Sequence, residues 1–290
     1  MIWVTGSRGM LGKDITGVLN KRGIPFVESD IEIDLTSKIS VLSFVKDRNI
    51  DWIINCAAYT AVDAAEDERK KAFSVNSDVL MNLVDAAIVN DSRIIHFSTD
   101  YVYDGNKKSG YSEDDPTGPA GAYGASKLAG EIILRENYER YFIFRISWLY
   151  GFYGKNFVST MLNLFNQKDE INVVNDQYGS PTNTFELASF IAHIIKTDPK
   201  NYGVYNFSGE GITTWYEFAR EIYTRARMYG ILNKDVAIHP ISSSQYPTKA
   251  RRPEYSYMLK EKLFNTFSYK PANWKETLDM YIKELKTAIR

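Results

Sequence analysis

Short apolar runs alternate with longer amphipathic stretches through the first half of the chain. The apolar runs are rich in β-branched residues and continuous, which is typical of parallel strands buried on both faces. The stretches between them repeat apolar residues at the spacing of a helix. The predicted strands are Ile2–Thr5, Phe26–Val27, Trp52–Asn55, Arg93–Ser98 and Tyr141–Ile146, and the predicted helices are Met10–Lys21, Ile39–Arg48, Phe73–Asn90 and Ser126–Glu136.

This alternation predicts an α/β fold, a doubly wound parallel sheet of the Rossmann type with right-handed crossovers. The second half is less regular, and its clearest predicted elements are helices Phe157–Asn166 and Phe185–Lys196 and strands Ile171–Val174 and Val204–Phe207. We expect two domains. The dinucleotide-binding Rossmann domain comprises residues 1–149 plus roughly 171–208, and a smaller substrate-binding domain comprises residues 150–170 and 209–290.

The composition is that of an ordinary folded protein. Of the 290 residues, 44% are hydrophobic and 24% are charged, which excludes a disordered or coiled-coil chain. The net charge of −1 gives no reason to expect nucleic acid or an anionic membrane as a partner. No apolar run approaches the roughly 20 residues of a membrane helix. No cleavable signal pattern precedes the first strand, so we expect a cytoplasmic protein.

Three glycines form a turn between the first predicted strand and the first predicted helix. Gly6 suits a tight turn, Gly9 a close approach of the backbone to a ligand, and Gly12 close packing of the helix on the strand. The N–H groups at the start of that helix would then face a pyrophosphate. At the first strand of an alternating chain, this spacing predicts a dinucleotide site.

The residues around the second strand leave the choice of dinucleotide open. Asp30 follows that strand and could accept hydrogen bonds from the adenosine ribose hydroxyls, which favours NADH. Arg8 lies inside the glycine turn and could bind a 2′-phosphate, which favours NADPH. We therefore predict NADPH or NADH, with Asp34 and Leu35 close to the adenine.

Tyr123 and Lys127 are four residues apart, so on a helix their side chains share one face. We expect the ammonium group to lower the pKa of the phenol and make it a usable proton donor. The lysine can also hold the nicotinamide ribose. Ligands bind at the carboxyl ends of parallel strands, so Ser98 or Thr99 should face Tyr123.

Two further segments suggest ligand contacts. Small residues at the end of the third strand, Ala57 and Ala58, would let the cofactor pass. Arg251 and Arg252 lie in a loop bounded by prolines, where paired guanidinium groups could hold a diphosphate. A surface basic pair is the alternative interpretation of these two arginines.

The glycine turn, Asn55–Ala58, the Tyr123–Lys127 spacing and the chain length resemble the extended short-chain dehydrogenase/reductases. Finer motifs resemble one branch of that family, the dTDP-4-dehydrorhamnose reductases. The resemblance covers nearly the whole chain. These motifs are Ala58–Glu66, Ser98–Gly105, Tyr123–Glu131, Arg145–Gly151, Asn156-Phe157, Asp176–Thr182, Thr214-Trp215 and Arg252-Pro253.

The resemblance implies reduction of the C4 ketone of dTDP-4-dehydro-β-L-rhamnose by NADPH or NADH, the last step of dTDP-rhamnose biosynthesis for cell-surface polysaccharide. It implies that Tyr123 protonates the C4 oxygen, that Lys127 tunes the phenol and holds the ribose, and that Thr99 hydrogen-bonds the reacting oxygen. The implied cofactor contacts are Gly9, Met10 and Leu11 for pyrophosphate, Asp34 and Leu35 for adenine, and Ala58, Tyr59 and Thr60 for the nicotinamide side. The implied substrate contacts are Thr99, Asp100, Trp148, Asn156 and Arg252.

The sequence does not support a metal site. The single Cys56 and the dispersed His96, His193 and His239 offer no ligand cluster. Some members of the branch are described as dimers bridged by a metal through acidic residues. Asp14 could be one such residue, but no partner for it can be matched. We expect a monomer or homodimer without a predicted Mg²⁺ site.

Three other functions are found on this scaffold. A sugar-nucleotide 4,6-dehydratase carries Asp-Glu after the threonine at the strand end, whereas here Tyr101 follows Thr99-Asp100. An epimerase needs an extra Cys or His near the sugar, and none is evident. A non-catalytic, dinucleotide-binding regulatory subunit would not need Thr99, Tyr123 and Lys127 together.

Overall fold

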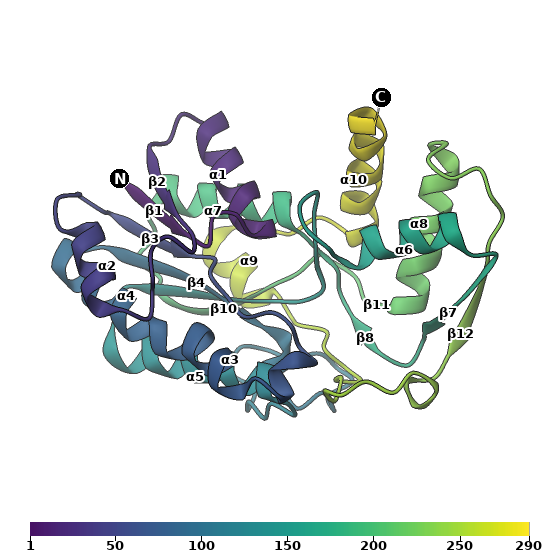
Figure 1. Cartoon of the computed structure of the whole chain (residues 1–290), viewed down its shortest axis with the longest axis horizontal. Coiled ribbons are helices and arrows are strands. Elements are labelled where there is room, and N and C mark those ends of the chain that lie inside the picture. Colours follow the sequence, from purple (N-terminus) through teal and green to yellow (C-terminus); the bar gives the residue numbers. More distant parts are fainter. Residues whose placement is uncertain (290) are drawn as a thin grey trace.

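The computed structural model describes residues 1–289, with side chains for residues 1–287. Six parallel strands form the main sheet in the order β10-β5-β4-β3-β1-β2, so the strand order reverses beside β1 (Figure 1). This confirms the predicted α/β class with a doubly wound sheet. The strands are β1 Ile2–Thr5, β2 Phe26–Ser29, β3 Trp52–Asn55, β4 Arg93–Thr99, β5 Tyr141–Ile146 and β10 Gly203–Phe207.

Successive residues of each strand face opposite layers of helices. Ile2 and Val4 of β1 pack in one apolar cluster, whereas Trp3 between them packs in the other. Helices α1 and α7 cover the first face, and α2, α4 and α5 cover the second (Figure 1). The bounds are α1 Met10–Lys21, α2 Lys38–Val45, α4 Val79–Asn90, α5 Ala122–Asn137 and α7 Thr184–Thr197.

The predicted helix Phe73–Asn90 is interrupted. The observed helical stretch begins four residues earlier than predicted, with α3, Arg69–Phe73. A single π-helical turn, η2, Ser74–Asp78, then connects α3 to α4. The whole stretch Arg69–Asn90 is long and apolar enough to cross a membrane by composition alone, but half of its apolar window is buried. It packs against α2 and α5, which is the setting of a helix in the core of a folded domain.

A second lobe carries its own apolar core (Figure 1). The core gathers residues of α6, Phe157–Gln167, α8, Trp215–Met228, and α10, Trp274–Ile289. Within the described residues, three two-stranded pairings, β6 with β9, β7 with β12 and β8 with β11, complete the fold. Their strands are β6 Leu149–Tyr150, β7 Glu170–Val174, β8 Tyr178–Gly179, β9 Thr182–Asn183, β11 Thr213–Thr214 and β12 Ala237–Ile241.

Two segments lie elsewhere than the predicted domain boundaries place them. The strand predicted at Ile171–Val174 does not join the main sheet, because β7 pairs with β12 and its apolar residues belong to the core of the second lobe. The short helix α9, Glu261–Phe267, lies within the segment assigned to the smaller domain. It packs against β10, where Leu263 and Phe267 join the core of the main sheet.

Candidate active site

The glycine turn has the geometry of a phosphate cradle. Gly6 has a φ of +61°, and a Cβ there would lie 2.5 Å from the backbone nitrogen of Ala57. A Cβ on Gly12 would collide with the backbone of Gly6, so α1 packs closely on the turn. Gly9 is the N-cap of α1, with no side-chain cap and no acidic residue in the first turn. The N–H groups of that turn therefore have no side-chain partner, which fits a pyrophosphate.

Arg8, from the glycine turn, contacts Asp30, which follows β2. The Arg8 N–H donates to one oxygen of Asp30 at 2.9 Å, and the Ile31 N–H donates to the other at 3.0 Å. The Arg8 guanidinium donates to the Glu32 carboxylate at 3.1 Å. Arg8 and Asp30 thus share the position at which a Rossmann fold binds the adenosine ribose.

The next turn, expected near the adenine, is held by its own side chains. Asp34 accepts hydrogen bonds from the N–H and the hydroxyl of Thr36, at 2.9 and 2.7 Å. These bonds lower the pKa of Asp34. The carbonyl of Leu35 accepts a hydrogen bond from Asn82 at 2.8 Å.

Tyr123 meets Thr99 where the start of α5 passes the end of β4. The Thr99 hydroxyl lies close enough to the phenol to lower its pKa, and of the two hydroxyl residues named at this strand end it is the one that does so. Burial nevertheless raises the pKa of Tyr123 well above its ordinary value, and Lys127 is not among the causes of the shift. The expected lowering of the Tyr123 pKa is therefore wrong, because desolvation of the phenolate is the largest influence on it.

Lys127 lies one helical turn beyond Tyr123 and is almost completely buried. Burial lowers its pKa to about 8, and the charges of Glu131 and Cys56 act in the opposite direction. Glu131 itself receives two hydrogen bonds from the buried Arg145, at 3.0 and 2.7 Å. A fixed carboxylate therefore lies near the buried ammonium group and favours its charged form.

Asp100 carries the strongest sign that this groove takes a ligand. One of its oxygens accepts a hydrogen bond from Thr99 at 3.0 Å, while the other is buried and has no partner. The hydroxyl of Ser98 is also buried without a partner. Burial raises the pKa of Asp100 to about 6, while the nearby hydroxyl groups of Ser256 and Thr99 act to lower it. Orphaned buried polar groups are rare in proteins, and a bound molecule would satisfy them.

The predicted substrate residues differ in how free their side chains are. Trp148 has a positive φ of 47° and stacks on Trp215 with 3.6 Å between ring centroids. Asn156 caps α6, accepting from the Ser159 N–H at 3.1 Å and donating to the Gly151 carbonyl at 2.8 Å. Its polar atoms are therefore already engaged in holding the helix.

Arg252 reaches the groove from the C-terminal loop. Its guanidinium donates to Asp63 at 2.6 Å and to the Tyr101 hydroxyl at 3.2 Å. The Tyr101 ring in turn packs edge-on against Tyr123, with 5.7 Å between centroids. Arg252 thus contacts both Asp63 and Tyr101, the residue that packs on the phenol, whereas Arg251 is exposed.

Two positioning residues escape sequence analysis. Asn76, buried in the π-helical turn η2, accepts from the Tyr59 N–H at 2.8 Å and donates to the Tyr59 carbonyl at 3.0 Å. It also donates to Ser126, between Tyr123 and Lys127, at 2.9 Å. Glu66 accepts a hydrogen bond from the Ala122 N–H at 2.7 Å and so caps the helix that carries Tyr123. Asn76 is marked in the structure by its place in a π-turn, a form common at functional sites, which the sequence pattern does not predict.

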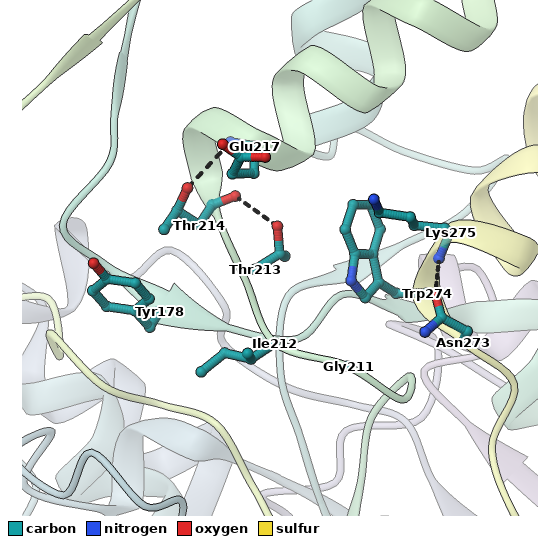
Figure 2. Close-up of a pocket in the computed structure, with 9 residues that line it drawn as sticks. All are labelled: Tyr178, Gly211, Ile212, Thr213, Thr214, Glu217, Asn273, Trp274 and Lys275. Carbon is teal, nitrogen blue, oxygen red and sulfur yellow. Dashed lines mark hydrogen bonds between the residues drawn. The ribbon is translucent and has the colours of Figure 1, made fainter.

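A separate cavity of about 490 Å³ lies at the start of α8 and α10 (Figure 2). Tyr178, Ile212 and Trp274 surround it, and none of the predicted site residues does. Tyr178 faces this cavity, whereas its neighbour Gly179 backs onto Trp148. The cavity is therefore separated from the catalytic groove by strand β8.

Within residues 1–289, no group of three or more His, Cys, Asp or Glu side chains is arranged to hold a metal ion. Asp14 is buried and accepts a hydrogen bond from the Thr184 hydroxyl. Burial raises its pKa, with Glu284 adding to the rise.

Comparisons with known proteins agree along the whole chain. A family model described as the RmlD substrate binding domain matches residues 1–287. The chain is 38% identical over 281 residues to the dTDP-4-dehydrorhamnose reductase of Aggregatibacter actinomycetemcomitans, covering 95% of this chain and 96% of that protein. It is 34% identical over 288 residues to the spore coat polysaccharide biosynthesis protein SpsK of Bacillus subtilis, covering 99% and 98%. A crystal structure of dTDP-4-dehydrorhamnose reductase from Bacillus anthracis in complex with NADP has a TM-score of 0.91 at 38% identity, covering 98% of both chains.

Proposed function

The chain belongs to the RmlD family of dTDP-4-dehydrorhamnose reductases, and we propose that the groove between Thr99, Tyr123 and Lys127 is where it reduces its substrate. The reaction is the NADPH- or NADH-dependent reduction of the C4 ketone of dTDP-4-dehydro-β-L-rhamnose to dTDP-β-L-rhamnose. The bound dinucleotide supplies the hydride. The protein must orient the ketone, exclude water and supply one proton to the C4 oxygen.

Tyr123 is the proton donor in this proposal. Its raised pKa keeps the phenol protonated at neutral pH, which is the form needed to protonate a developing alkoxide. The Thr99 hydroxyl lies beside the phenol and can donate to the same oxygen once it turns away from Asp100. Two hydroxyl groups then stabilise the negative charge that grows on the C4 oxygen.

Lys127 supplies positive charge one helical turn beyond Tyr123. Its ammonium group can hold the nicotinamide ribose by donating hydrogen bonds to the ribose hydroxyls. A buried cation is costly, and the Glu131–Arg145 pair reduces this cost by placing a carboxylate nearby. We assign Lys127 a binding and electrostatic role.

The second lobe holds the sugar nucleotide in this proposal. Asp100, with one unpartnered oxygen, would accept a hydrogen bond from a sugar hydroxyl. Trp148 and Trp215 are both half-buried, so their stack can offer an aromatic surface to the sugar. Arg252 would bind the diphosphate after leaving Asp63, because a bidentate guanidinium–phosphate contact is stronger than an exposed ion pair.

The single observation that carries this assignment is the contact of Tyr123 with Thr99 one turn before the buried Lys127. The test is an assay of NADPH and NADH oxidation against the dTDP-4-keto sugar, with the product identified by NMR. Oxidation of either cofactor with formation of dTDP-β-L-rhamnose supports the proposal. Binding of dinucleotide without turnover would point to a regulatory subunit instead.

Related chemistry on the same scaffold gives other products. Loss of water from a dTDP-hexose would identify a dehydratase, and inversion at carbon without net cofactor oxidation would identify an epimerase. We also propose a cytoplasmic location and a monomer or homodimer. Gel filtration of the purified chain measures the oligomeric state.

A further inference from the structure

We propose that Glu32 sets the choice between NADPH and NADH by competing with a 2′-phosphate for the Arg8 guanidinium. This inference rests on the proposed dinucleotide site and names the residue that tunes it. It assigns a function to a carboxylate that the chemistry of the reaction does not use.

Glu32 is bound at both of its oxygens. One oxygen accepts a hydrogen bond from the Asp30 N–H at 2.7 Å, and this bond holds the turn after β2 in place. The other accepts from the Arg8 guanidinium at 3.1 Å. The Arg8 and Glu32 side chains are 63% and 48% exposed, so the ion pair lies in solvent and exchanges easily.

Asp30 remains able to bind a ribose diol. Its two oxygens accept the Arg8 and Ile31 N–H groups, but a carboxylate offers about four acceptor positions. Ribose hydroxyls can therefore donate to Asp30 while Arg8 stays on Glu32. This arrangement suits NADH, since no anion needs the guanidinium.

A 2′-phosphate reverses the situation. It would bring negative charge between Asp30 and Glu32, and Arg8 is the cation at hand to neutralise it. Arg8 must then leave Glu32, and the freed carboxylate repels the phosphate. The pair thus permits NADPH but lowers its advantage over NADH, and Glu32 determines by how much.

Binding of adenosine fragments tests this without any turnover. The probes are 2′,5′-ADP and 5′-AMP, titrated by calorimetry against the full chain and its Glu32→Gln and Arg8→Met variants. Glu32→Gln keeps an oxygen for the Asp30 N–H and removes only the charge. We expect it to tighten 2′,5′-ADP by about three- to tenfold and to leave 5′-AMP within about twofold. Arg8→Met should weaken 2′,5′-ADP by about 10- to 100-fold.

The matched control is Asp91→Asn, which removes one negative charge from an exposed ion pair with Arg140 at the opposite end of the sheet. It should leave both affinities unchanged. An unchanged affinity ratio in Glu32→Gln, or an equal change in the control, overturns the proposal. If the wild-type chain binds neither fragment, the dinucleotide site itself is refuted, and the role of Glu32 falls with it. If the wild type binds both and only the ratio fails to respond, the proposed reductase function stands and the role of Glu32 does not.

Discussion

Burial acts in opposite directions on the two ionisable residues of the groove. It raises the pKa of the Tyr123 phenol, which keeps the proton that the reduction consumes. It lowers the pKa of Lys127 to about 8, which brings the loss of its charge close to the working pH. The Tyr123 phenol thus stays protonated because it is buried, whereas the charged form of Lys127 is favoured by the nearby carboxylate of Glu131.

Replacing Tyr123 by Phe removes the donor and keeps the ring. We expect kcat to fall by at least about 100-fold, since general acid catalysis contributes that much or more. Dinucleotide binding, followed by fluorescence titration, should stay within about twofold because the glycine turn is untouched. Tyr246→Phe, at an exposed tyrosine, is the control. Near-normal turnover in Tyr123→Phe would rule out the phenol as the acid.

The charge of Lys127 should appear in the pH dependence. The pKa of Lys127 is lowered to about 8, which is still above neutral pH. The ammonium form is therefore present at pH 7 and is lost as the pH rises through about 8. We therefore expect kcat/KM to decline above that pH. Lys127→Arg keeps its charge throughout this range, and its residual activity should show no such decline. An alkaline decline that is the same in both proteins contradicts the assignment.

At the scale of elements, the π-helical turn η2 connects Tyr59, which we propose lies on the nicotinamide side of the cofactor site, to the helix that carries Tyr123. Asn76 binds both backbone groups of Tyr59, much as a neighbouring strand would, and binds Ser126 on α5 with the same amide. Asn76 thus joins the loop at Tyr59 to helix α5 through three hydrogen bonds. We expect it to position these two segments and to take no part in proton transfer.

Asn76→Ala tests this connection. It leaves the backbone of Tyr59 without its partners, so we expect the free energy of unfolding to drop by about 1–3 kcal/mol. The KM for the dinucleotide should rise by about tenfold or more because the nicotinamide loop is no longer fixed. The sugar-nucleotide KM should change less. Asn166→Ala, which removes only a bond to the Leu162 carbonyl one turn earlier, should reproduce neither effect.

The sequence predicted these elements unevenly, for physical reasons. β1, β3, β5 and α1 are confirmed at their predicted bounds, because continuous apolar strands and a regular amphipathic helix carry their pattern locally. The π-turn and the role of Asn76 could not be foreseen, since the amide is satisfied by Tyr59 and Ser126, which are distant in sequence. The pairing of β7 with β12 depends likewise on a strand more than 60 residues later.

At the scale of the whole molecule, the two lobes are joined across the groove by charged contacts. Asp63 holds Arg252 and also accepts from the Ala250 N–H at 3.0 Å, while Asp67 pairs with Lys249. The short 3-10 turn that follows Asp63, η1 Ala64–Glu66, also caps the catalytic helix through Glu66. Residues 63–67 therefore contact both the loop that carries Arg252 and the helix that carries Tyr123.

This arrangement separates the two arginines that the sequence could not distinguish. We expect Arg252→Gln to raise the KM for the sugar nucleotide more than about tenfold, because a charge-assisted phosphate contact is lost. Arg251→Gln, at an exposed position, should change it by about twofold or less. Steady-state kinetics at saturating cofactor measures both. Equal effects of the two substitutions would contradict a specific role for Arg252.

The stability of the link between α7 and the start of α10 should depend on pH through Glu186. One of its oxygens accepts from the Ala272 N–H at 2.6 Å and the other is buried without a partner, and burial with the charges of Glu210 and Glu276 raises its pKa to about 7. The folded state thus holds a proton that the unfolded state releases at lower pH, so stability falls as the pH rises from the ordinary value of about 4.5 to about 7 and is level above it. Glu186→Gln keeps an acceptor and removes the charge. We expect it to stabilise the protein by about 1–3 kcal/mol at pH 8 and far less at pH 5, as measured by urea unfolding. The control Glu136→Gln, at an exposed position, should change neither value. A stability difference that does not depend on pH would show that ionisation of Glu186 is not the cause.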